Sequence, residues 1–247
     1  MPVLGVIPAR LGSTRLLNKP LQLLAGEPLV TRVIQRVRAF GLVDTLIVAT
    51  DSTMIARIAE LSGVRALLTS EAHESGTDRV AEVGCLEEFG HHDVIVNIQS
   101  DEPFLPRAAL AGAIERVRSG EDIGTAAAPL DAADVHDPSR VKVVTDERGR
   151  ALYFSRAPIP FRRETTPVIP ALYWQHLGVY AFRRAALERW GGLTAAPAEA
   201  AERLEQLRAL HHGMTIGVAR LDTPAQPGVD TPDDLRRAEA HWFRQES

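Results

Sequence analysis

This chain of 247 residues has a single cysteine, no long apolar segment and no excess of basic charge. Cys85 is its one cysteine, which excludes an internal disulfide and a thiolate metal cluster. We expect Cys85 to be a small buried residue within a helix. No apolar run approaches the roughly 18 residues of a membrane-spanning helix, and the apolar N-terminal stretch is too short for a signal-peptide core. A cytoplasmic protein without a membrane partner is expected.

The charge balance and the histidines exclude further classes. The chain has 28 Lys and Arg against 32 Asp and Glu, so no nucleic-acid-binding surface is expected. His91-His92 and His211-His212 are adjacent pairs whose side chains diverge, whereas metal ligands on a helix are spaced i, i+4. No Ser-His-Asp set and no G-x-S-x-G motif is present. An anionic ligand must therefore be bound by a local cluster of cations.

Three short apolar runs are typical of strands covered on both faces: Val3–Ile7, Leu46–Ala49 and Val94–Ile98. Helical patterns lie between them; two end near Gly41 and Gly63, and the third extends from about Thr77 to Gly90. This alternation predicts an α/β fold with a doubly wound, mostly parallel, Rossmann-like sheet. In such sheets ligands bind at the carboxyl ends of the strands.

The second half of the chain has more β character. Val141–Thr145 and Ala151–Phe154 flank a loop in which Gly149 suits a left-handed position, so a hairpin is expected. A proline-rich stretch, a strand around Leu177–Phe182 and a helix at residues 204–210 follow.

The chain closes on a predicted helix whose start, Asp230-Thr231-Pro232, has the residues of a cap. No internal repeat or clear linker divides the sequence. We therefore expect a single domain over residues 1–247, with an inserted β-rich flap at about residues 131–190.

Cations and small residues follow the first predicted strand. Arg10, Arg15 and Lys19 lie within ten residues, interleaved with Gly12 and hydroxyl residues. Arginine offers forked donors that match phosphate oxygens, and lysine acts as a point charge. A solvated basic loop is the alternative, but the position after a core strand favours a phosphate site. The segment is neither a P-loop nor a Rossmann fingerprint.

Acidic residues follow the third predicted strand, in the segment Gln99-Ser100-Asp101-Glu102-Pro103. Carboxylates facing a phosphate loop suit Mg²⁺, which takes one or two carboxylates plus phosphate oxygens. Helix capping ahead of Pro106 is the alternative, and it suits Glu102 better than Asp101. The segment Ser75–Arg79 has the residues of a helix start, where N–H groups favour an anion; ordinary capping requires the same residues.

These segments together resemble the 3-deoxy-manno-octulosonate (Kdo) cytidylyltransferases, also called CMP-Kdo synthetases. The resemblance covers nearly the whole chain and is carried by IPAR, STR and KPL in residues 7–21, VATD at 48–51, ESGTDR at 74–79, QSDEP at 99–103, VKVV at 141–144, ALYFSRAPIP at 151–160, HLGVYAF at 176–182, LEQLR at 204–208 and VDTPDDL at 229–235. The N-terminal loop is shared with several sugar nucleotidyltransferases, whereas the YFSR, HLGVY and LEQLR series is more particular to Kdo enzymes. The resemblance implies a nucleotidyltransferase fold, and transfer of CMP from CTP to Kdo with release of pyrophosphate, for lipopolysaccharide biosynthesis.

The resemblance also implies roles for individual residues. The nucleotide-binding residues would be Pro8, Ala9, Arg10, Ser13, Arg15, Lys19, Ser75, Gly76, Arg79 and Gln99. The sugar-binding residues would be Gln99, Arg156, His176, Tyr180, Glu205 and Gln206. Asp101 and Asp230 would bind the catalytic Mg²⁺, and with Arg10 and Lys19 they form the catalytic set. A solvated helix face is the alternative for Glu205 and Gln206. The resemblance also implies a homodimer, and a dimer through the β-rich region is expected.

Three departures from the family pattern bear on the substrate. Ser100 stands where the family has glycine, Leu17-Asn18 replaces Pro-Gly in the nucleotide loop, and alanines in residues 197–201 replace larger side chains. Because asparagine tolerates left-handed backbone, we expect the loop to be preserved. The other two leave open a cytidylyltransferase for 8-amino-Kdo, sialic or pseudaminic acid. A nucleotide-binding protein without catalysis is the last alternative; the retained Asp101 and Asp230 argue against it.

Overall fold

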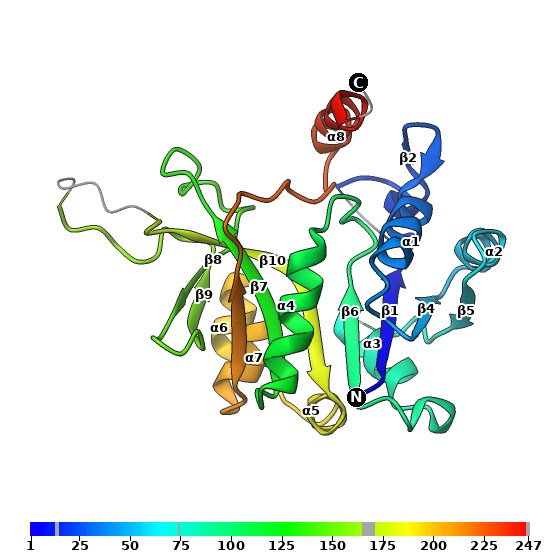
Figure 1. The fold of residues 1–247 in the computed structure, drawn as a ribbon, viewed down its shortest axis with the longest axis horizontal. Helices are drawn as coiled ribbons and strands as arrows, with labels where there is room; N and C mark the ends of the chain where they lie inside the picture. Colours follow the sequence, from blue (N-terminus) through cyan, green and yellow to red (C-terminus); the bar gives the residue numbers. More distant parts are fainter. Residues whose placement is uncertain (13–14, 74, 165–170, 246–247) are drawn as a thin grey trace. The chain divides into compact units, whose positions relative to one another are not determined.

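The computed structural model describes residues 1–12, 15–73, 75–164 and 171–245 (Figure 1). The chain divides into two compact units: Met1–Arg107 with Gln226–Ser247, here the first unit, and Ala108–Ala225, the second unit. In the described part of the chain, no helix has both the length and the apolar character needed to cross a membrane. The single domain with an inserted flap stays a prediction.

Four parallel strands form the sheet of the first unit, in the order β6-β1-β4-β5. They span Val3–Ala9 (β1), Thr45–Thr50 (β4), Arg65–Leu68 (β5) and Val94–Ile98 (β6). Every residue of β1 and β6 is buried, which explains why both sequences are apolar apart from Asn97 of β6. The three strands expected from the sequence are confirmed. Strand β5 lies at the sheet edge with its residues exposed or partly exposed, so its sequence carries no comparable pattern.

Three helices connect these strands: α1 (Leu29–Phe40), α2 (Thr53–Leu61) and α3 (Gly76–Gly84). The end of α1 follows the sequence signal at Gly41, and the start of α2 has a side-chain cap. Gly41 closes α1 in the left-handed conformation, with φ of 61°. At the start of α2, Ser52 Oγ accepts a hydrogen bond from the backbone N–H of Ile55 at 3.4 Å.

The third helix is shorter than the sequence predicts. It ends at Gly84, and a separate 3-10 turn, η2, spans Glu87–Phe89. Between them Leu86 has an extended backbone with ψ of 140°, which interrupts the helical path. Cys85 therefore lies at the C-cap of α3 and is exposed. The expectation of a buried Cys85 within a helix is wrong.

The order of strand addition reverses at β1. The chain places β4 and then β5 on one side of β1, and returns through α3 to place β6 on the other side (Figure 1). This is the topological switch point at which doubly wound sheets bind ligands. The segments that follow β1 and β6 therefore leave the sheet at the expected place for a site.

The last helix belongs to the first unit. Helix α8 spans Pro232–Gln245 and contacts β2 (Leu23–Leu24), which pairs with β3 (Glu27–Pro28). Leu235 and Trp242 of α8 pack against a hydrophobic cluster. Its buried members, here the switch-point cluster, are Leu16, Leu24, Leu29, Phe104, Val229 and Ala238. The cluster thus joins the C-terminal segment to the loops after β1 and β6.

The second unit holds the remaining strands. Strand β7 (Ile123–Pro129) lies parallel to β11 (Ile216–Arg220) and antiparallel to β10 (Trp174–Arg183). Strand β8 (Lys142–Thr145) pairs with β10 and with β9 (Ala151–Ser155). The β8–β9 hairpin is as the sequence predicts, with Gly149 at φ of 76°.

The helices of this unit are α4 (Arg107–Arg118), whose first residue closes the first unit, α5 (Arg184–Trp190), α6 (Pro197–Glu202) and α7 (Gln206–His211). Helix α4 approaches β7 closely, because a Cβ on Gly124 would lie 1.9 Å from the carbonyl oxygen of Ala113. The helix expected at residues 204–210 begins later, because Arg203 has left-handed backbone with φ of 51° and separates α6 from α7.

Candidate active site

Three charged side chains converge from distant parts of the first unit. Lys19 begins the 3-10 turn η1 (Lys19–Leu21), Asp101 follows β6, and Asp230 precedes α8. The Lys19 ammonium donates to Asp101 Oδ2 and to Asp230 Oδ1, the second contact at 2.9 Å. Arg15 Nη2 lies 3.1 Å from the same Asp230 oxygen. The structure therefore brings together four residues that the sequence analysis assigned to phosphate and metal.

Apolar and backbone contacts hold these segments in place. The N–H of Val229 donates to the carbonyl oxygen of Asp101 at 2.9 Å, which ties the segment before α8 to the end of β6. Leu16, Phe104 and Val229 belong to the switch-point cluster, and each is at most three residues from a member of the charged group. Burial of the cluster therefore fixes the backbone positions from which the charges project.

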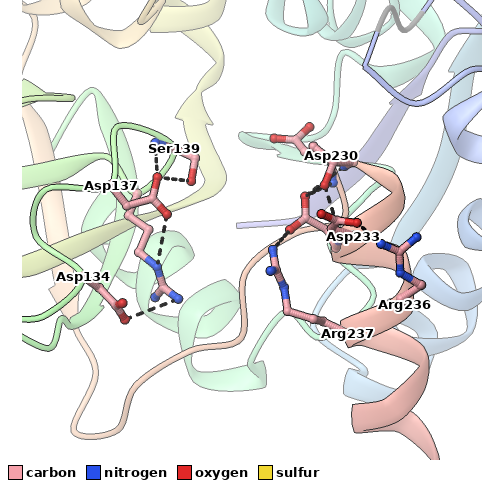
Figure 2. A network of polar contacts seen from close by, with 10 residues as sticks. Asp134, Asp137, Ser139, Asp230, Asp233, Arg236 and Arg237 are labelled. Carbon is pink, nitrogen blue, oxygen red and sulfur yellow. Dashed lines mark hydrogen bonds and ion pairs between the residues drawn. The ribbon is translucent and has the colours of Figure 1, made fainter.

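Thr231, and not Asp230, caps helix α8. Thr231 Oγ1 accepts from the N–H of Asp234 at 3.2 Å, and the Asp234 carboxylate accepts from the N–H of Thr231 at 2.9 Å. This reciprocal pair is a capping box. Asp230 lies just before it, with Arg236 and Arg237 further along the helix (Figure 2). The predicted cap at the start of this helix is confirmed and is made by Thr231, whereas the carboxylate of Asp230 faces Lys19 and Arg15.

The electrostatics of the group keep Lys19 charged. Burial works to lower the pKa of Lys19, but the Asp101 and Asp230 carboxylates outweigh it and raise that pKa above its ordinary value. Burial also raises the pKa of the neighbouring Glu102 to about 8, with the charges of Asp101 and Asp230 adding to the effect. At neutral pH Lys19 is therefore a charged ammonium, and Glu102 is mainly protonated.

The donor set fits a hard divalent cation. One oxygen each from Asp101 and Asp230 contacts the same nitrogen, so the two carboxylates already converge on one cationic centre. Within the residues that the structure describes, no cluster of three or more His, Cys, Asp or Glu side chains could hold a metal. A site of two carboxylates completed by substrate oxygens and water is the kind that Mg²⁺ uses.

The end of β1 and the start of α3 lie against each other. The position of a Cβ on Gly76 is 3.5 Å from Pro8 Cγ and 3.9 Å from Gln99 Oε1, so three predicted nucleotide-binding residues share one location. Ser75 is the N-cap of α3, where its Oγ accepts from the N–H of Asp78 at 3.1 Å. Ser75 therefore performs the capping role that was the alternative for this segment.

The rest of the loop after β1 is placed in part. Ala9 is the last residue of β1 and is buried, whereas Arg10 is exposed directly after it. The predicted contact of Ser13 lies outside the described residues. Because Arg10 is exposed, its guanidinium is accessible to a ligand that arrives from solvent.

Arg79 is buried, with 2% of its surface exposed. Its guanidinium donates to Asp51 Oδ2 at 2.7 Å and to Thr69 Oγ1. Because Asp51 follows β4 and Thr69 follows β5, Arg79 ties α3 to the ends of two strands. Sequence reasoning misses this triad, since Arg79 is 28 and 10 residues from its partners with no regular spacing. The one available signal is the position of Asp51 at a strand end.

In the second unit, His176 and Tyr180 lie together on β10, with ring centroids 5.2 Å apart. His176 Nε2 is 3.0 Å from Thr125 Oγ1 of β7. Burial lowers the pKa of His176 to about 3. Burial, with a smaller effect from the charge of Glu205, raises the pKa of Tyr180 well above its ordinary value. Both side chains are therefore uncharged at neutral pH and suit hydrogen bonding rather than proton transfer.

Arg156 follows β9 and is bonded to backbone carbonyls. Its Nε donates to Glu202 O at 2.7 Å, its Nη1 to Pro138 O at 2.8 Å and its Nη2 to Arg203 O at 3.3 Å. The Glu202 carboxylate accepts in return from the Arg156 N–H and from Ser155 Oγ, at 2.9 and 2.6 Å. Arg156 thus has a structural role beside its predicted contact with the sugar acid.

Lys142 also binds the backbone of Arg156, and sequence reasoning misses this contact. The side chain is fully buried and donates to the carbonyl oxygens of Asp137 and Arg156, at 3.0 and 2.6 Å. Burial lowers the pKa of this ammonium. The Asp137 carboxylate meanwhile accepts from the N–H of Ser139 at 2.8 Å (Figure 2). The one signal in the sequence is a lysine within the apolar run VKVV.

The start of α7 carries the last predicted sugar-binding residues. Glu205 is the N-cap residue and is partly buried, and Gln206 is 6% exposed. A solvated helix face is therefore wrong for Gln206. The alanine-rich residues 197–201 lie in α6. Three hydrogen bonds from the Arg208 guanidinium of α7 to the Glu199 carboxylate, at 2.6, 2.9 and 3.1 Å, join α6 to α7.

Two of the departures from the family pattern have a visible outcome. Asn18 has left-handed backbone with φ of 51°, so asparagine preserves the turn before Lys19 as expected. Ser100 is buried between Gln99 and Asp101, with 8% exposed.

Comparison with known proteins identifies the family of the chain. The family model for Cytidylyltransferase matches residues 4–216. The 3-deoxy-manno-octulosonate cytidylyltransferase of Gemmatimonas aurantiaca is 51% identical over 98% of this chain and 95% of its own length. The enzyme of the same name from Polynucleobacter necessarius is 44% identical over 95% of this chain and 93% of its own length.

A solved structure of CMP:2-keto-3-deoxy-manno-octonic acid synthetase complexed with CTP is similar over 99% of this chain and 100% of that chain, with a TM-score of 0.91 and 35% identity. This match confirms the predicted nucleotidyltransferase fold, a mostly parallel α/β sheet with added antiparallel strands. The resemblance in the sequence is confirmed by the same comparisons. The chain belongs to the 3-deoxy-manno-octulosonate cytidylyltransferase family.

Proposed function

We propose that the protein transfers CMP from CTP to Kdo, forming CMP-Kdo and releasing pyrophosphate. The observation that carries this proposal is 51% identity, over nearly the whole chain, to a relative named for that reaction. The similar solved synthetase is complexed with CTP, which supports CTP as the nucleotide. We further propose that the product serves lipopolysaccharide biosynthesis in the cytoplasm.

The reaction is an in-line attack of the sugar's anomeric hydroxyl on the α-phosphorus of CTP. Arg10, Arg15 and Lys19 bind the triphosphate and stabilise the charge that develops on the departing pyrophosphate. Gly76 and Gln99 hold the nucleotide beside the end of β1, where their positions converge. Catalysis then depends mainly on positioning and charge stabilisation.

Asp101 and Asp230 are the proposed ligands of the catalytic Mg²⁺. Support comes from their convergence on one cationic nitrogen and from the capping of α8 by Thr231, which leaves Asp230 without a need to cap. When bound, Mg²⁺ lowers the pKa of a coordinated hydroxyl and polarises phosphate oxygens.

Arg156, His176, Tyr180, Glu205 and Gln206 are proposed to bind the sugar acid. The neutral His176 and Tyr180 offer hydrogen bonds to sugar hydroxyls, because neither side chain ionises near neutral pH. With a pKa of about 3, His176 is too weak a base to take the proton of the attacking hydroxyl. The guanidinium of Arg156 suits a sugar carboxylate.

A pyrophosphate-release assay tests the assignment. The protein is supplied with CTP, Mg²⁺ and one sugar acid at a time: Kdo, 8-amino-Kdo, N-acetylneuraminate or pseudaminate. We expect release with Kdo, and none when the sugar, CTP or Mg²⁺ is omitted. Turnover with N-acetylneuraminate but with neither Kdo nor its 8-amino analogue would overturn the substrate. No release with any acid would support a binding protein without catalysis.

A further inference from the structure

Lysine is rare in this chain, and in each of the two lysines the side-chain nitrogen contacts two oxygen atoms. Of the 28 basic residues, 26 are arginine, and the lysines are Lys19 and Lys142. Lys142 is fully buried and donates to two backbone carbonyls. Lys19 contacts two carboxylates instead. A compact ammonium on a flexible four-carbon stem fits both positions better than a planar guanidinium.

The charges around Lys19 are balanced within the protein. Lys19 and Arg15 supply two positive charges, and Asp101 and Asp230 supply two negative ones. The Lys19 and Asp101 side chains are only 17% and 19% exposed, so solvent screens them weakly. Arg15 and Lys19 also share one oxygen, Asp230 Oδ1. The same four side chains are the proposed ligands of the triphosphate and of Mg²⁺.

Pairing with Asp101 and Asp230 and binding of the triphosphate both require the ammonium of Lys19, so they compete with each other. A divalent cation added to Asp101 and Asp230, with Lys19 and Arg15 still in contact, places four positive charges against two negative ones beside the weakly screened Lys19 and Asp101. A triphosphate changes the balance, because its oxygens accept the donors of Lys19 and Arg15 and release the carboxylates. The backbone of Lys19 is fixed by η1 and the switch-point cluster, whereas its side chain can turn about its own bonds.

We propose that Lys19 is an exchangeable counter-ion, which neutralises Asp101 and Asp230 until a nucleoside triphosphate draws it away, so that the two carboxylates accept a divalent cation only together with the nucleotide. The inference rests on the proposed function and adds an order to it. Metal and nucleotide bind as a unit, and the carboxylates do not collect free cations beforehand.

The two lysines make a direct test possible. Protein labelled with ¹³C at lysine Cε gives two lysine side-chain signals, and the Lys19→Arg variant assigns them. We expect CTP with EDTA to shift the Lys19 signal and to leave the Lys142 signal in place as an internal reference. Mg²⁺ alone at millimolar concentration should move neither. A Lys19 signal that CTP leaves unmoved, or that Mg²⁺ alone moves as far as CTP does, would overturn the exchange.

Metal binding without nucleotide gives the second measurement. Mn²⁺ titrations followed by electron paramagnetic resonance should show at least tenfold tighter binding in Lys19→Met than in the wild type. That gain should vanish in Lys19→Met/Asp101→Asn. Arg65→Met is the matched control, because it removes one cation from a solvent-exposed pair with Glu88. Equal Mn²⁺ affinity in the wild type and Lys19→Met would contradict the counter-ion role, even in an enzyme that makes CMP-Kdo. Failure to form CMP-Kdo would instead contradict the proposed function.

Discussion

At the scale of single residues, Asp230 and Thr231 are neighbours with different tasks. Thr231 exchanges hydrogen bonds with Asp234 at the start of α8, and Asp230 faces Lys19 and Arg15. We expect Thr231→Ala to lose about 1 kcal/mol of unfolding free energy, the usual cost of a lost cap, with activity retained. Asp230→Asn should fold normally and lose kcat by roughly 100-fold or more, because it removes charge from a site that binds charge.

Asp101→Asn extends this test. Because both carboxylates are proposed to hold one ion, the double variant with Asp230→Asn should be little worse than either single variant. Steady-state kinetics and urea unfolding on the four variants measure both effects. An active Asp230→Asn enzyme, or defects in kcat that simply multiply, would remove the shared-metal site.

His176 gives a prediction about pH. Its pKa is lowered from 6.5 to about 3 by burial, so the unfolded chain binds a proton that the folded chain refuses between these values. Stability is therefore lost as the pH falls below 6.5, by about 1.4 kcal/mol per pH unit, or about 2 kcal/mol at pH 5. His176→Gln keeps a hydrogen-bonding group beside Thr125 and does not titrate.

Urea unfolding at pH 7.5, 6 and 5 compares the two proteins. The wild type should lose about 2 kcal/mol more than His176→Gln between the first and last pH. Parallel losses in the two proteins would show that His176 is not held neutral by burial.

At the scale of elements, Arg79 joins the start of α3 to the strand ends that carry Asp51 and Thr69. Removing one partner of a buried ion pair leaves the other charge uncompensated. We expect Arg79→Met to lose about 3–5 kcal/mol of unfolding free energy. Arg65→Met, which breaks an exposed pair in the same unit, should lose at most about 1 kcal/mol. Equal losses in urea titrations would mean that Arg79 does not hold these elements together.

The helices and strands differ in how far the sequence could predict them. Strands β1, β4 and β6 and helices α1 and α2 have continuous or periodic apolar residues and recognisable caps, and all five are found as expected. The end of α3 was not visible, because it depends on the extended backbone of Leu86 rather than on a Gly or Pro signal. The edge strand β5 has no pattern, since it is exposed.

Within the site, local signals found the charges but not their partners. The strand-end rule placed Lys19 and Asp101 near each other, and the family resemblance added Asp230. Periodicity carries no information about contacts 82 and 211 residues apart, such as those of Lys19. For the same reason the support that Lys142 gives to Arg156 appears only in the fold.

At the scale of the whole molecule, assembly stays a proposal. Leu152, Tyr153 and Phe161, in and after β9, are 62%, 38% and 85% exposed, which is unusual for large apolar side chains so close in sequence. Tyr173, in the same β-rich region, is buried against Leu130 and Val135 of its own unit and does not contribute. We expect a homodimer by light scattering at micromolar concentration, and a shift toward monomer in Phe161→Glu. A wild-type monomer would contradict this proposal.

The identity of the product tests the central claim most directly. The protein is given limiting CTP, Mg²⁺ and equal concentrations of Kdo, 8-amino-Kdo and N-acetylneuraminate, and the nucleotide sugars formed are identified by mass spectrometry. We expect CMP-Kdo as the main product, with one pyrophosphate released for each CMP-sugar formed. CMP-N-acetylneuraminate as the main product, or CTP consumed without any CMP-sugar, would contradict it.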